Sequence, residues 1–569
     1  MTPHIMSGGG SRASGAPSKS KSFRSPRDRL TPRLSRATPS QPRAPGKCEN
    51  RNRGPEAPVS VQSCELPRKF DGAKRAAGLA TSKVIRARTG GIASKDFVRY
   101  LFLMTGMIKR IRDPVHGLIT FDLGDEVDRA AWRLINTPEF QRLRRVRQLG
   151  VSEFTFPGAT HTRLSHSIGV FHVARRLTDV ALRHVPKDKQ NPSRARTAKL
   201  AALLHDLGHG PFSHAFENAE KARLKENYRD HEEWTAELIQ RKSGNIRQIL
   251  KDEFKGGGSM ADDIAALLRG DEPDLYSSVV SSSFDADRLD YLQRDRMMTG
   301  SGAGAIDFDW LLDNLRVVDV RSSSVEPSNT LEDVDDAESN TIQAFAFEEK
   351  ALQAAESFIL ARFHLYSQVY LHKTTRGVEQ MLTAFLRAFS QEAANGDRAD
   401  LAVPLDHPLR VYFAKPIPDL ESYVGLDDAV VWGALELSAA RGNGQIREFA
   451  ERICSRRIMK GVAIDMVNPQ SIDYARRTYI NENLRGKFGT IIFEDRAPLS
   501  IYKDPSKETV KPHKRVYIRR DGGKVVDIAS LSRPIAALYQ EQEVLRYYFI
   551  NENDRKKVLD IKGDNDAAP

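Results

Sequence analysis

Eight of the 14 histidines in this 569-residue chain lie between His161 and His231. At the centre of this cluster is the segment HDLGHGPFSH, which runs from His205 to His214. The adjacent His205 and Asp206 offer an imidazole nitrogen and a carboxylate to one ion, and mixed nitrogen and oxygen donors suit Mn, Fe, Ni, Co or Zn. The preceding AKLAALLHDL indicates a helix that enters a Gly-Pro turn, where ligands can lie at a pocket mouth. The pattern predicts a metal site on a mainly helical fold.

Two other interpretations of the His-Asp segment are a structural histidine in the core and a zinc-protease motif. A buried histidine is more often a hydrogen-bonded core residue than a metal ligand, so the His-Asp pair alone is weak evidence. His205 and His209 also have the HxxxH spacing of a zinc-protease helix. Asp206 stands where such a helix has Glu, and Gly208 and Gly210 would break the helix. The protease is therefore disfavoured.

Two flanking segments strengthen the metal-site prediction. Arg163 and His166 are three residues apart and therefore neighbours on a helix face. Asp287, Tyr291 and Asp295 recur every four residues, which places them on one stripe of a second helix. The alternative for that stripe is a solvated helix with internal ion pairs to nearby arginines.

Together these motifs resemble the HD-domain phosphohydrolases. The closer resemblance is to the deoxynucleoside triphosphate (dNTP) triphosphohydrolases of the dGTPase family, including the catalytic core of the mammalian dNTPase that also carries a sterile-alpha-motif domain. It extends in order through DPVHG at 113–117, TPEFQRLR at 137–144, FPGA at 156–159 and YLHK at 370–373. No sterile-alpha-motif domain is recognisable. The resemblance implies an all-helical catalytic core and a homo-oligomer.

The resemblance assigns roles to individual residues. As ligands of a divalent metal (Mn, Mg, Fe, Ni, Co or Zn) it implies His166, His205, Asp206 and Asp287. As catalytic residues it implies Arg163 on the triphosphate, His214 with Glu217 as the general-acid pair, and His231 near the phosphates. As substrate-binding residues it implies Arg288 and Arg362 for phosphate charge, and Gln148, Leu149, Tyr291, Asp295 and Tyr370 for the sugar pocket. The family has a shorter acid at 217, and the mammalian enzyme has Lys at 288.

The implied reaction is attack of water on the α-phosphorus, which yields a deoxynucleoside and inorganic triphosphate. Tyr370 would exclude a 2′-hydroxyl and so select deoxynucleotides. Asn136 stands where the mammalian enzyme reads guanine with Asp, and Asn lacks the second carboxylate oxygen. Arg112 and Leu118 also differ at corresponding positions. GTP activation of that kind is not expected, while another nucleotide effector stays open.

Two other functions remain open. The first is an HD phosphohydrolase that acts on another nucleotide, although no Gly-Tyr-Pro follows the His-Asp pair, which disfavours a cyclic-di-nucleotide phosphodiesterase. The second is a nucleotide-sensing or nucleic-acid-binding module with a vestigial metal site. The complete ligand set argues against the second.

Charge divides the chain into two parts. Residues 1–106 contain 21 Lys+Arg and 6 Asp+Glu, a net of +15, whereas the whole chain has a net of +12. The remaining residues therefore carry −3, and their charge does not favour a nucleic-acid partner. Residues 1–106 are rich in Ser, Pro, Gly, Arg and Ala without hydrophobic period, which predicts disorder. They are interpreted as a nucleic-acid tail, an organelle transit peptide, or sequence upstream of a true start at Met107, and the last is favoured.

Cysteine content and apolar runs predict a cytoplasmic protein without a membrane span. The three cysteines include only Cys454 after residue 106, so no disulfide framework is expected there. The apolar run at 100–108 is too short to cross a bilayer.

The predicted fold class is mainly α. It comprises an all-helical HD-domain core at 107–400, a smaller α+β C-terminal lobe at 401–569 and the disordered extension at 1–106. The hydrophobic pattern predicts helices at about 166–185, 195–207, 231–242, 344–373, 376–391 and 428–440. Strands are expected at 315–320, 342–347 and 489–493, and a hairpin at 516–528. Thr137 and Pro138 are expected to begin a helix.

Overall fold

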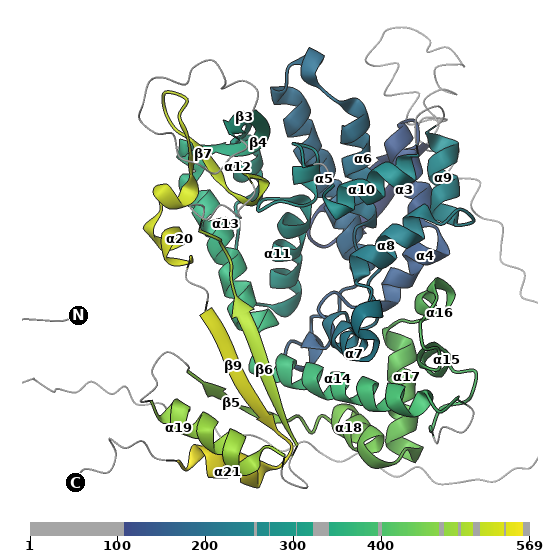
Figure 1. Ribbon diagram of the computed structural model, residues 1–569. Coiled ribbons are helices and arrows are strands. Elements are labelled where there is room, and N and C mark those ends of the chain that lie inside the picture. Colours follow the sequence, from purple (N-terminus) through teal and green to yellow (C-terminus); the bar gives the residue numbers. More distant parts are fainter. Residues whose placement is uncertain are drawn as a thin grey trace, which may run out of the picture. The chain divides into compact units, whose positions relative to one another are not determined.

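The computed structural model describes residues 107–254, 259–271, 273–302, 304–321, 341–396, 401–465, 471–486, 491–504, 512–539 and 542–561. All of them belong to one compact unit. Helices predominate in this part of the chain, and its strands form small sheets, which confirms the mainly α fold class (Figure 1). The predicted disorder of 1–106 lies outside the described residues. No described helix is both long and apolar enough to cross a membrane.

A hairpin and a group of helices form the first part of the fold. The hairpin consists of β1 (Ile108–Asp113) and β2 (Gly117–Asp122), and it was not predicted from the sequence. The helices are α3 (Glu126–Ile135), α4 (Pro138–Arg142), α5 (Arg163–His184), α6 (Pro192–Leu204), α7 (His214–Leu224), α8 (His231–Gln240), α9 (Asn245–Glu253), α10 (Met260–Arg269) and α11 (Ala286–Thr299). Helix α5 packs against both α6 and α11 and buries residues on most of its surface.

The predicted start of α4 is confirmed. Thr137 is the N-cap, its hydroxyl accepts a hydrogen bond from the Phe140 backbone N–H, and Pro138 occupies the first helical turn. Proline is tolerated there because its missing N–H would have no partner within the helix.

Two larger sheets contain the remaining strands. The first has the order β3 (Leu315–Arg321), β4 (Thr341–Glu348), β7 (Tyr517–Arg519) and β8 (Val525–Asp527), and β7 with β8 is the predicted hairpin. The second has the order β5 (Lys460–Ile464), β9 (Gln542–Phe549) and β6 (Ile492–Leu499). Among the described strands, β4 and β7 are the only pair that is parallel. The strand expected at 489–493 begins at Ile492 in β6, and 487–490 lie outside the described residues.

The helix predicted at 344–373 is wrong over its first residues. Strand β4 continues to Glu348 because its backbone pairs with β3 and β7, and this pairing decides the conformation of an apolar run that sequence pattern leaves ambiguous. Helix α13 (Leu352–Leu365) follows, then a π-turn at Tyr366–Tyr370, and then α14 (Lys373–Ala393).

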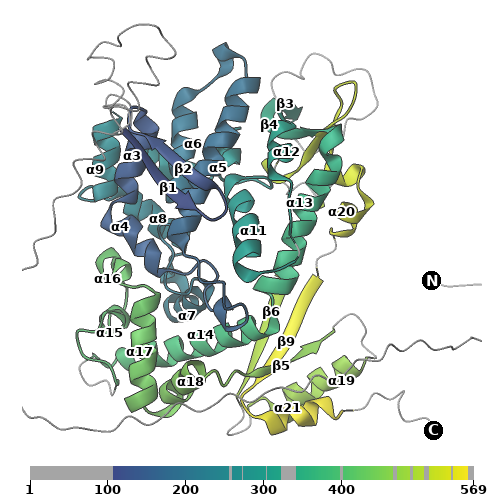
Figure 2. The same cartoon turned by 180° about the vertical axis from the view of Figure 1, so that it is seen from behind.

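Residues after 400 share the core of the preceding helices. The helices after residue 400 are α15 (Pro408–Phe413), α16 (Leu420–Val424), α17 (Asp428–Arg441), α18 (Gly444–Cys454), α19 (Ile472–Tyr479), α20 (Arg533–Ala537) and α21 (Glu552–Leu559), and the short helix α12 (Phe308–Asp313) lies before them, between α11 and β3. Helix α14 packs against α7 on one side and α18 on the other, and the two views of the ribbon agree on this arrangement (Figures 1 and 2). A separate small hydrophobic cluster joins β5, β9 and α21.

Candidate active site

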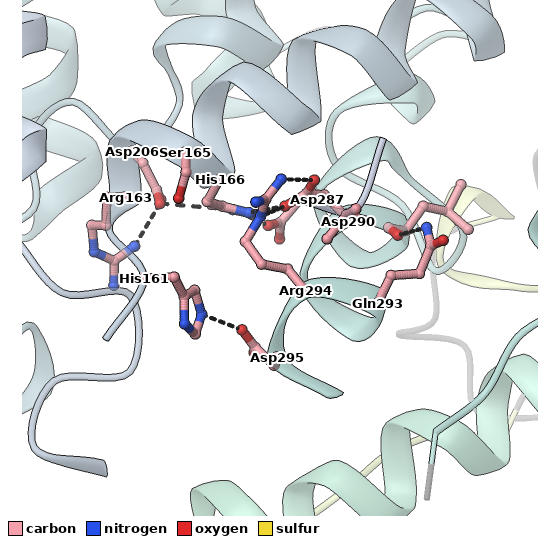
Figure 3. Close-up of polar contacts among 12 residues, drawn as sticks. His161, Arg163, Ser165, His166, Asp206, Asp287, Asp290, Gln293, Arg294 and Asp295 are labelled. Carbon is pink, nitrogen blue, oxygen red and sulfur yellow. Dashed lines mark hydrogen bonds and ion pairs between the residues drawn. The ribbon is translucent and has the colours of Figure 1, made fainter. Parts of the chain in front are cut away.

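The predicted metal ligands come together from three helices. His166 lies in the first turns of α5, His205 and Asp206 directly follow α6, and Asp287 lies in the first turn of α11. Nε2 of His166 is 3.0 Å from Oδ1 of Asp287, and Nε2 of His205 is 3.7 Å from the same oxygen. Oδ1 of Asp206 is 3.3 Å from Nε2 of His205. Figure 3 shows His166 between Asp206 and Asp287.

The two histidines have the geometry that a metal ligand needs. Nδ1 of His166 is 2.8 Å from Oδ2 of Asp290, and Nδ1 of His205 is 2.9 Å from the Ala202 carbonyl oxygen. Both Nε2 atoms are buried and have no hydrogen-bond partner among the described residues. A donor Nδ1–H fixed to an oxygen leaves the Nε2 lone pair free for a metal. Together with a carboxylate oxygen of Asp287, the two histidines form a group that can hold a divalent ion. The predicted fourth ligand, Asp206, lies beside this group, with Oδ1 3.3 Å from Nε2 of His205.

The charged groups of this cluster are buried and shift one another's pKa values. Burial alone would lower the pKa of His166, but its interactions with Asp287 and Asp290 outweigh burial and raise this pKa to about 10, so a metal ion that binds Nε2 must displace a proton from it. Burial would raise the pKa of Asp206, but the Arg163 guanidinium outweighs burial, so this pKa lies well below its usual range. The carboxylates therefore supply the negative charge that a divalent cation requires.

A buried hydrogen-bond network holds the Nδ1 side of the His166 ring through Asp290. Nε and Nη2 of Arg294 donate hydrogen bonds to Oδ2 and Oδ1 of Asp290, both at 2.8 Å. Nη1 of Arg294 donates to Oδ2 of Asp113 at 2.9 Å. Nε2 of His116 lies 2.6 Å from Oδ1 of Asp290, the oxygen that does not contact His166. Figure 3 shows Arg294 directed at Asp290. Because Arg294 is fully buried, the solvated-helix interpretation of α11 is wrong. Apart from the acidic spacing, no sequence pattern predicts this network.

Arg163 contacts the loop that follows the metal pair. We call His205–Ser213 the HD loop. Nη1 of Arg163 lies 2.5 Å from Oδ2 of Asp206, and Nη2 donates to the Ser213 hydroxyl at 2.7 Å. In this structure the guanidinium is therefore bonded to protein groups at the edge of the metal site.

The predicted acid–base residues lie beside the HD loop. Oε1 of Glu217 is 3.0 Å from Nδ1 of His231, and Oε2 is 3.4 Å from Nδ1 of His214. Burial would raise the pKa of Glu217, but hydrogen bonds with His214 and His231 hold it well below its usual range. The His214 side chain is 69% exposed, so it can reach a bound molecule.

His209 belongs to this cluster and was not among the predicted site residues. Its Nε2 lies 3.3 Å from Oδ1 of Asp206, and its ring stacks on His231 with centroids 3.8 Å apart. Ligand atoms of His209, Glu217 and His231 lie within 4.8 Å of one another. The repeat of histidines in the HD loop is the sequence signal for His209, although the sequence assigns this residue no role beyond the disfavoured protease spacing.

Asp295 and Tyr370, two of the predicted sugar-pocket residues, are in direct contact. The two carboxylate oxygens of Asp295 contact Nε2 of His161 at 2.7 Å and the Tyr370 hydroxyl at 2.5 Å. The Tyr291 and Tyr370 rings meet edge to face at 6.3 Å. Figure 3 shows His161 directed at Asp295. His161 is a second residue that the sequence analysis did not single out.

The remaining predicted residues differ in their surroundings. Leu149 is half-buried against the core, and the buried Oε1 of Gln148 has no hydrogen-bond partner among the described residues. Arg288 forms an ion pair with Asp285. Nη1 of Arg362 donates to the Ile501 carbonyl at 3.0 Å, and its guanidinium lies over the Tyr366 ring.

Comparison with known proteins agrees with this geometry. The HD domain model matches residues 163–292, and the HD associated region matches 339–414. The uncharacterized protein YwfO of Bacillus subtilis is 32% identical over 357 residues, which cover 62% of this chain and 72% of YwfO. The zebrafish deoxynucleoside triphosphate triphosphohydrolase SAMHD1 is 24% identical over 490 residues, which cover 80% of this chain and 72% of that protein.

A solved structure supports the same assignment. A phosphohydrolase from Bacteroides thetaiotaomicron is similar with a TM-score of 0.57 and 26% identity, over 78% of this chain and 99% of that one. In the curated relatives that the chain matches, the matched segment covers between 52% and 72% of the relative's own length. The sequence matches and the assembled His and Asp ligands agree: the chain belongs to the HD-domain family of metal-dependent phosphohydrolases.

Proposed function

We propose that the protein is a dNTP triphosphohydrolase of the dGTPase type, which converts a deoxynucleoside triphosphate into a deoxynucleoside and inorganic triphosphate. The observation that carries the proposal is the stripe on α11. Asp287 lies at the metal site, and Asp295, two turns later, is bonded to His161 and Tyr370. One helix therefore supplies both a metal ligand and a polar group suited to a sugar hydroxyl. The similarity to SAMHD1 proteins supports the same substrate class.

The proposed reaction replaces the bond between the α-phosphorus and the 5′-oxygen with a bond to a water oxygen. When bound by His166, His205, Asp206 and Asp287, a divalent metal supplies Lewis-acid activation of water and stabilises phosphoryl charge. The departing 5′-oxygen takes its proton from His214, which Glu217 orients through Nδ1. His231, held by the other oxygen of Glu217, faces the phosphates together with Arg163.

The remaining substrate-binding residues contact the triphosphate charge and the sugar. Arg288 and Arg362 oppose the negative charge of the triphosphate. Gln148, Leu149 and Tyr291 line the sugar with Asp295, and the Tyr370 ring occupies the space of a 2′-hydroxyl. A homo-oligomeric state, a nucleotide effector and a cytoplasmic location stay predictions from the sequence.

Product analysis tests the proposal. The full chain is incubated with each dNTP, the matching ribonucleotides and Mn²⁺ or Mg²⁺, with and without GTP or dGTP as effector. Deoxynucleoside and triphosphate are then separated and quantified. We expect both products from the wild type and none from His205→Ala/Asp206→Ala. Release of orthophosphate or pyrophosphate instead, or no turnover under any of these conditions, contradicts the proposal.

A further inference from the structure

The HD loop is bonded by side chains from a distant part of the chain. The Tyr423 hydroxyl donates to the Gly208 carbonyl at 2.6 Å, and the Phe212 backbone N–H donates to Oδ1 of Asp428 at 2.8 Å. We call residues 423–428, which end α16 and begin α17, the clamp segment. Both of its side chains that reach the HD loop are buried. The clamp segment thus satisfies backbone groups on both sides of the Gly-Pro turn.

Arg142 joins the clamp segment to the same loop. Its Nε donates to the Leu426 carbonyl at 2.9 Å, and its Nη2 donates to the His209 carbonyl at 2.7 Å. The Arg142 side chain is almost completely buried. Arg144, by contrast, is exposed and bonds only locally to Gln141.

Asp428 uses both carboxylate oxygens on backbone donors. Oδ1 accepts from Phe212, and Oδ2 accepts from the Arg147 N–H at 2.8 Å. The neighbouring Asp427 caps α17 by accepting from the Val430 N–H and also forms an ion pair with Arg145, but among the described residues it forms no hydrogen bond to the HD loop. Since Arg147 pairs with Thr162 just before α5, Asp428 ties the HD loop to the start of that helix.

The turn that Asp428 holds is strained. Phe212 and Ser213 have φ values of 52° and 46°, in the left-handed region that non-glycine residues rarely adopt. Such residues persist only where their surroundings fix them. The Ser213 hydroxyl accepts from Arg163, and the next residue, His214, begins α7. The turn therefore sets the positions of two candidate catalytic side chains at once.

We propose that Asp428, assisted by Tyr423, is a positioning residue that holds the strained end of the HD loop and so aligns Arg163 and His214 with the substrate. The hydrogen bonds that Tyr423 and Asp428 form with the described residues go to backbone groups and not to the side chains of the candidate metal ligands, so we expect metal binding to persist without them. The expected effect of these residues on turnover rests on the proposed function. The conformational consequence does not, because it concerns only the HD loop.

The test compares Asp428→Asn with Asp427→Asn in the full chain. Asparagine keeps the size of Asp428, but its amide nitrogen faces one of two backbone donors and loses a hydrogen bond. Asparagine at 427 can still cap α17. Amide hydrogen exchange is measured in peptides that cover 207–214. We expect exchange there to rise by about tenfold or more in Asp428→Asn alone, while peptides of α5 keep wild-type rates.

Turnover provides the second measurement. We expect Asp428→Asn to lower kcat by about tenfold or more with KM and Mn²⁺ binding within about twofold of wild type. Tyr423→Phe, which removes only the bond to Gly208, carries the exchange test if Asp428→Asn does not fold. Unchanged exchange at 207–214, or equal acceleration in Asp427→Asn, overturns the proposal. If the wild type hydrolyses no dNTP, the proposed function fails, whereas the exchange experiment still decides the role of Asp428.

Discussion

Nδ1 of His166 lies 2.8 Å from Oδ2 of Asp290, so the opposite edge of the ring faces Asp287. Asp290 is itself fixed by Arg294, which in turn reaches Asp113 at the end of β1. The orientation of a candidate metal ligand therefore depends on the N-terminal hairpin as well as on α11.

Removing the charge of Asp290 should weaken metal binding. Replacement of a residue that orients a ligating histidine commonly lowers metal affinity by about 10- to 100-fold. We expect a loss of this size for Asp290→Asn, measured by calorimetric titration of the folded full chain with Mn²⁺. Asp295→Asn is the control, because Asp295 lies on the same helix but contacts His161 and Tyr370. Equal affinities of Asp290→Asn and the wild type would contradict this role.

Gly169 should be required by the same network. A Cβ at this position would lie 1.9 Å from Oδ1 of Asp290 and 2.4 Å from Nη2 of Arg294. Since both groups are buried and paired, Gly169→Ala is expected to lower the free energy of unfolding by about 2 kcal/mol or more. Urea unfolding measures the change. Gly302→Ala serves as the control, since its Cβ would meet nothing within 4 Å. Similar unfolding curves for both variants would disprove the steric argument.

The His214 imidazole should contribute to turnover and not to metal binding. Loss of a general acid commonly lowers the rate by about 10²- to 10⁴-fold. We expect a decrease in this range in kcat for His214→Gln with dNTP, and an Mn²⁺ affinity equal to that of the wild type. Steady-state kinetics and calorimetry provide the two values. A variant with nearly full kcat would remove His214 from the mechanism.

Tyr370 should control discrimination against ribonucleotides through its ring. Tyr370→Phe removes the hydroxyl bond to Asp295 but keeps the ring, whereas Tyr370→Ala opens the space beside the sugar. We expect the ratio of kcat/KM for ribonucleotide over deoxynucleotide to rise about tenfold or more in Tyr370→Ala and to change little in Tyr370→Phe. If both variants keep the wild-type ratio, another group selects the sugar.

His172 should make part of the stability sensitive to acid. Burial, followed by electrostatic repulsion from His116 and two neighbouring arginines, lowers the pKa of His172 to about 4. Between pH 4 and its ordinary value of about 6.5 the unfolded chain binds this proton more readily. The stability that the neutral His172 contributes to the free energy of unfolding is therefore complete above pH about 6.5 and is lost as the pH falls toward 4.

The matching experiment is urea unfolding at pH 7 and pH 5. His172→Gln should lose less free energy of unfolding than the wild type on this change, by on the order of 1 kcal/mol once partial exposure is allowed for. A variant that keeps the neighbouring charges is essential, since those charges also act on other groups. Identical losses in the two proteins would show that His172 is not the acid-sensitive group.

Local patterns in the sequence determined the features that depend on neighbouring residues. The stripe of Asp287, Tyr291 and Asp295 follows from helical periodicity, and it lies on α11 as expected. The start of α4 at Thr137 and the β7–β8 hairpin likewise follow from short-range rules of capping and turns. The His-Asp motif and its flanking segments indicated the HD-domain family.

The tertiary structure decided which polar residues become buried and which segments contact one another. Asp428 bonds to Phe212 across 216 residues of chain, and no local pattern distinguishes it from the capping Asp427 beside it. Burial of Arg294 likewise needs Asp113 from the hairpin, and β4 is a strand because β3 and β7 pair with it. Periodicity reports the face of an element, whereas such pairings depend on how distant elements pack.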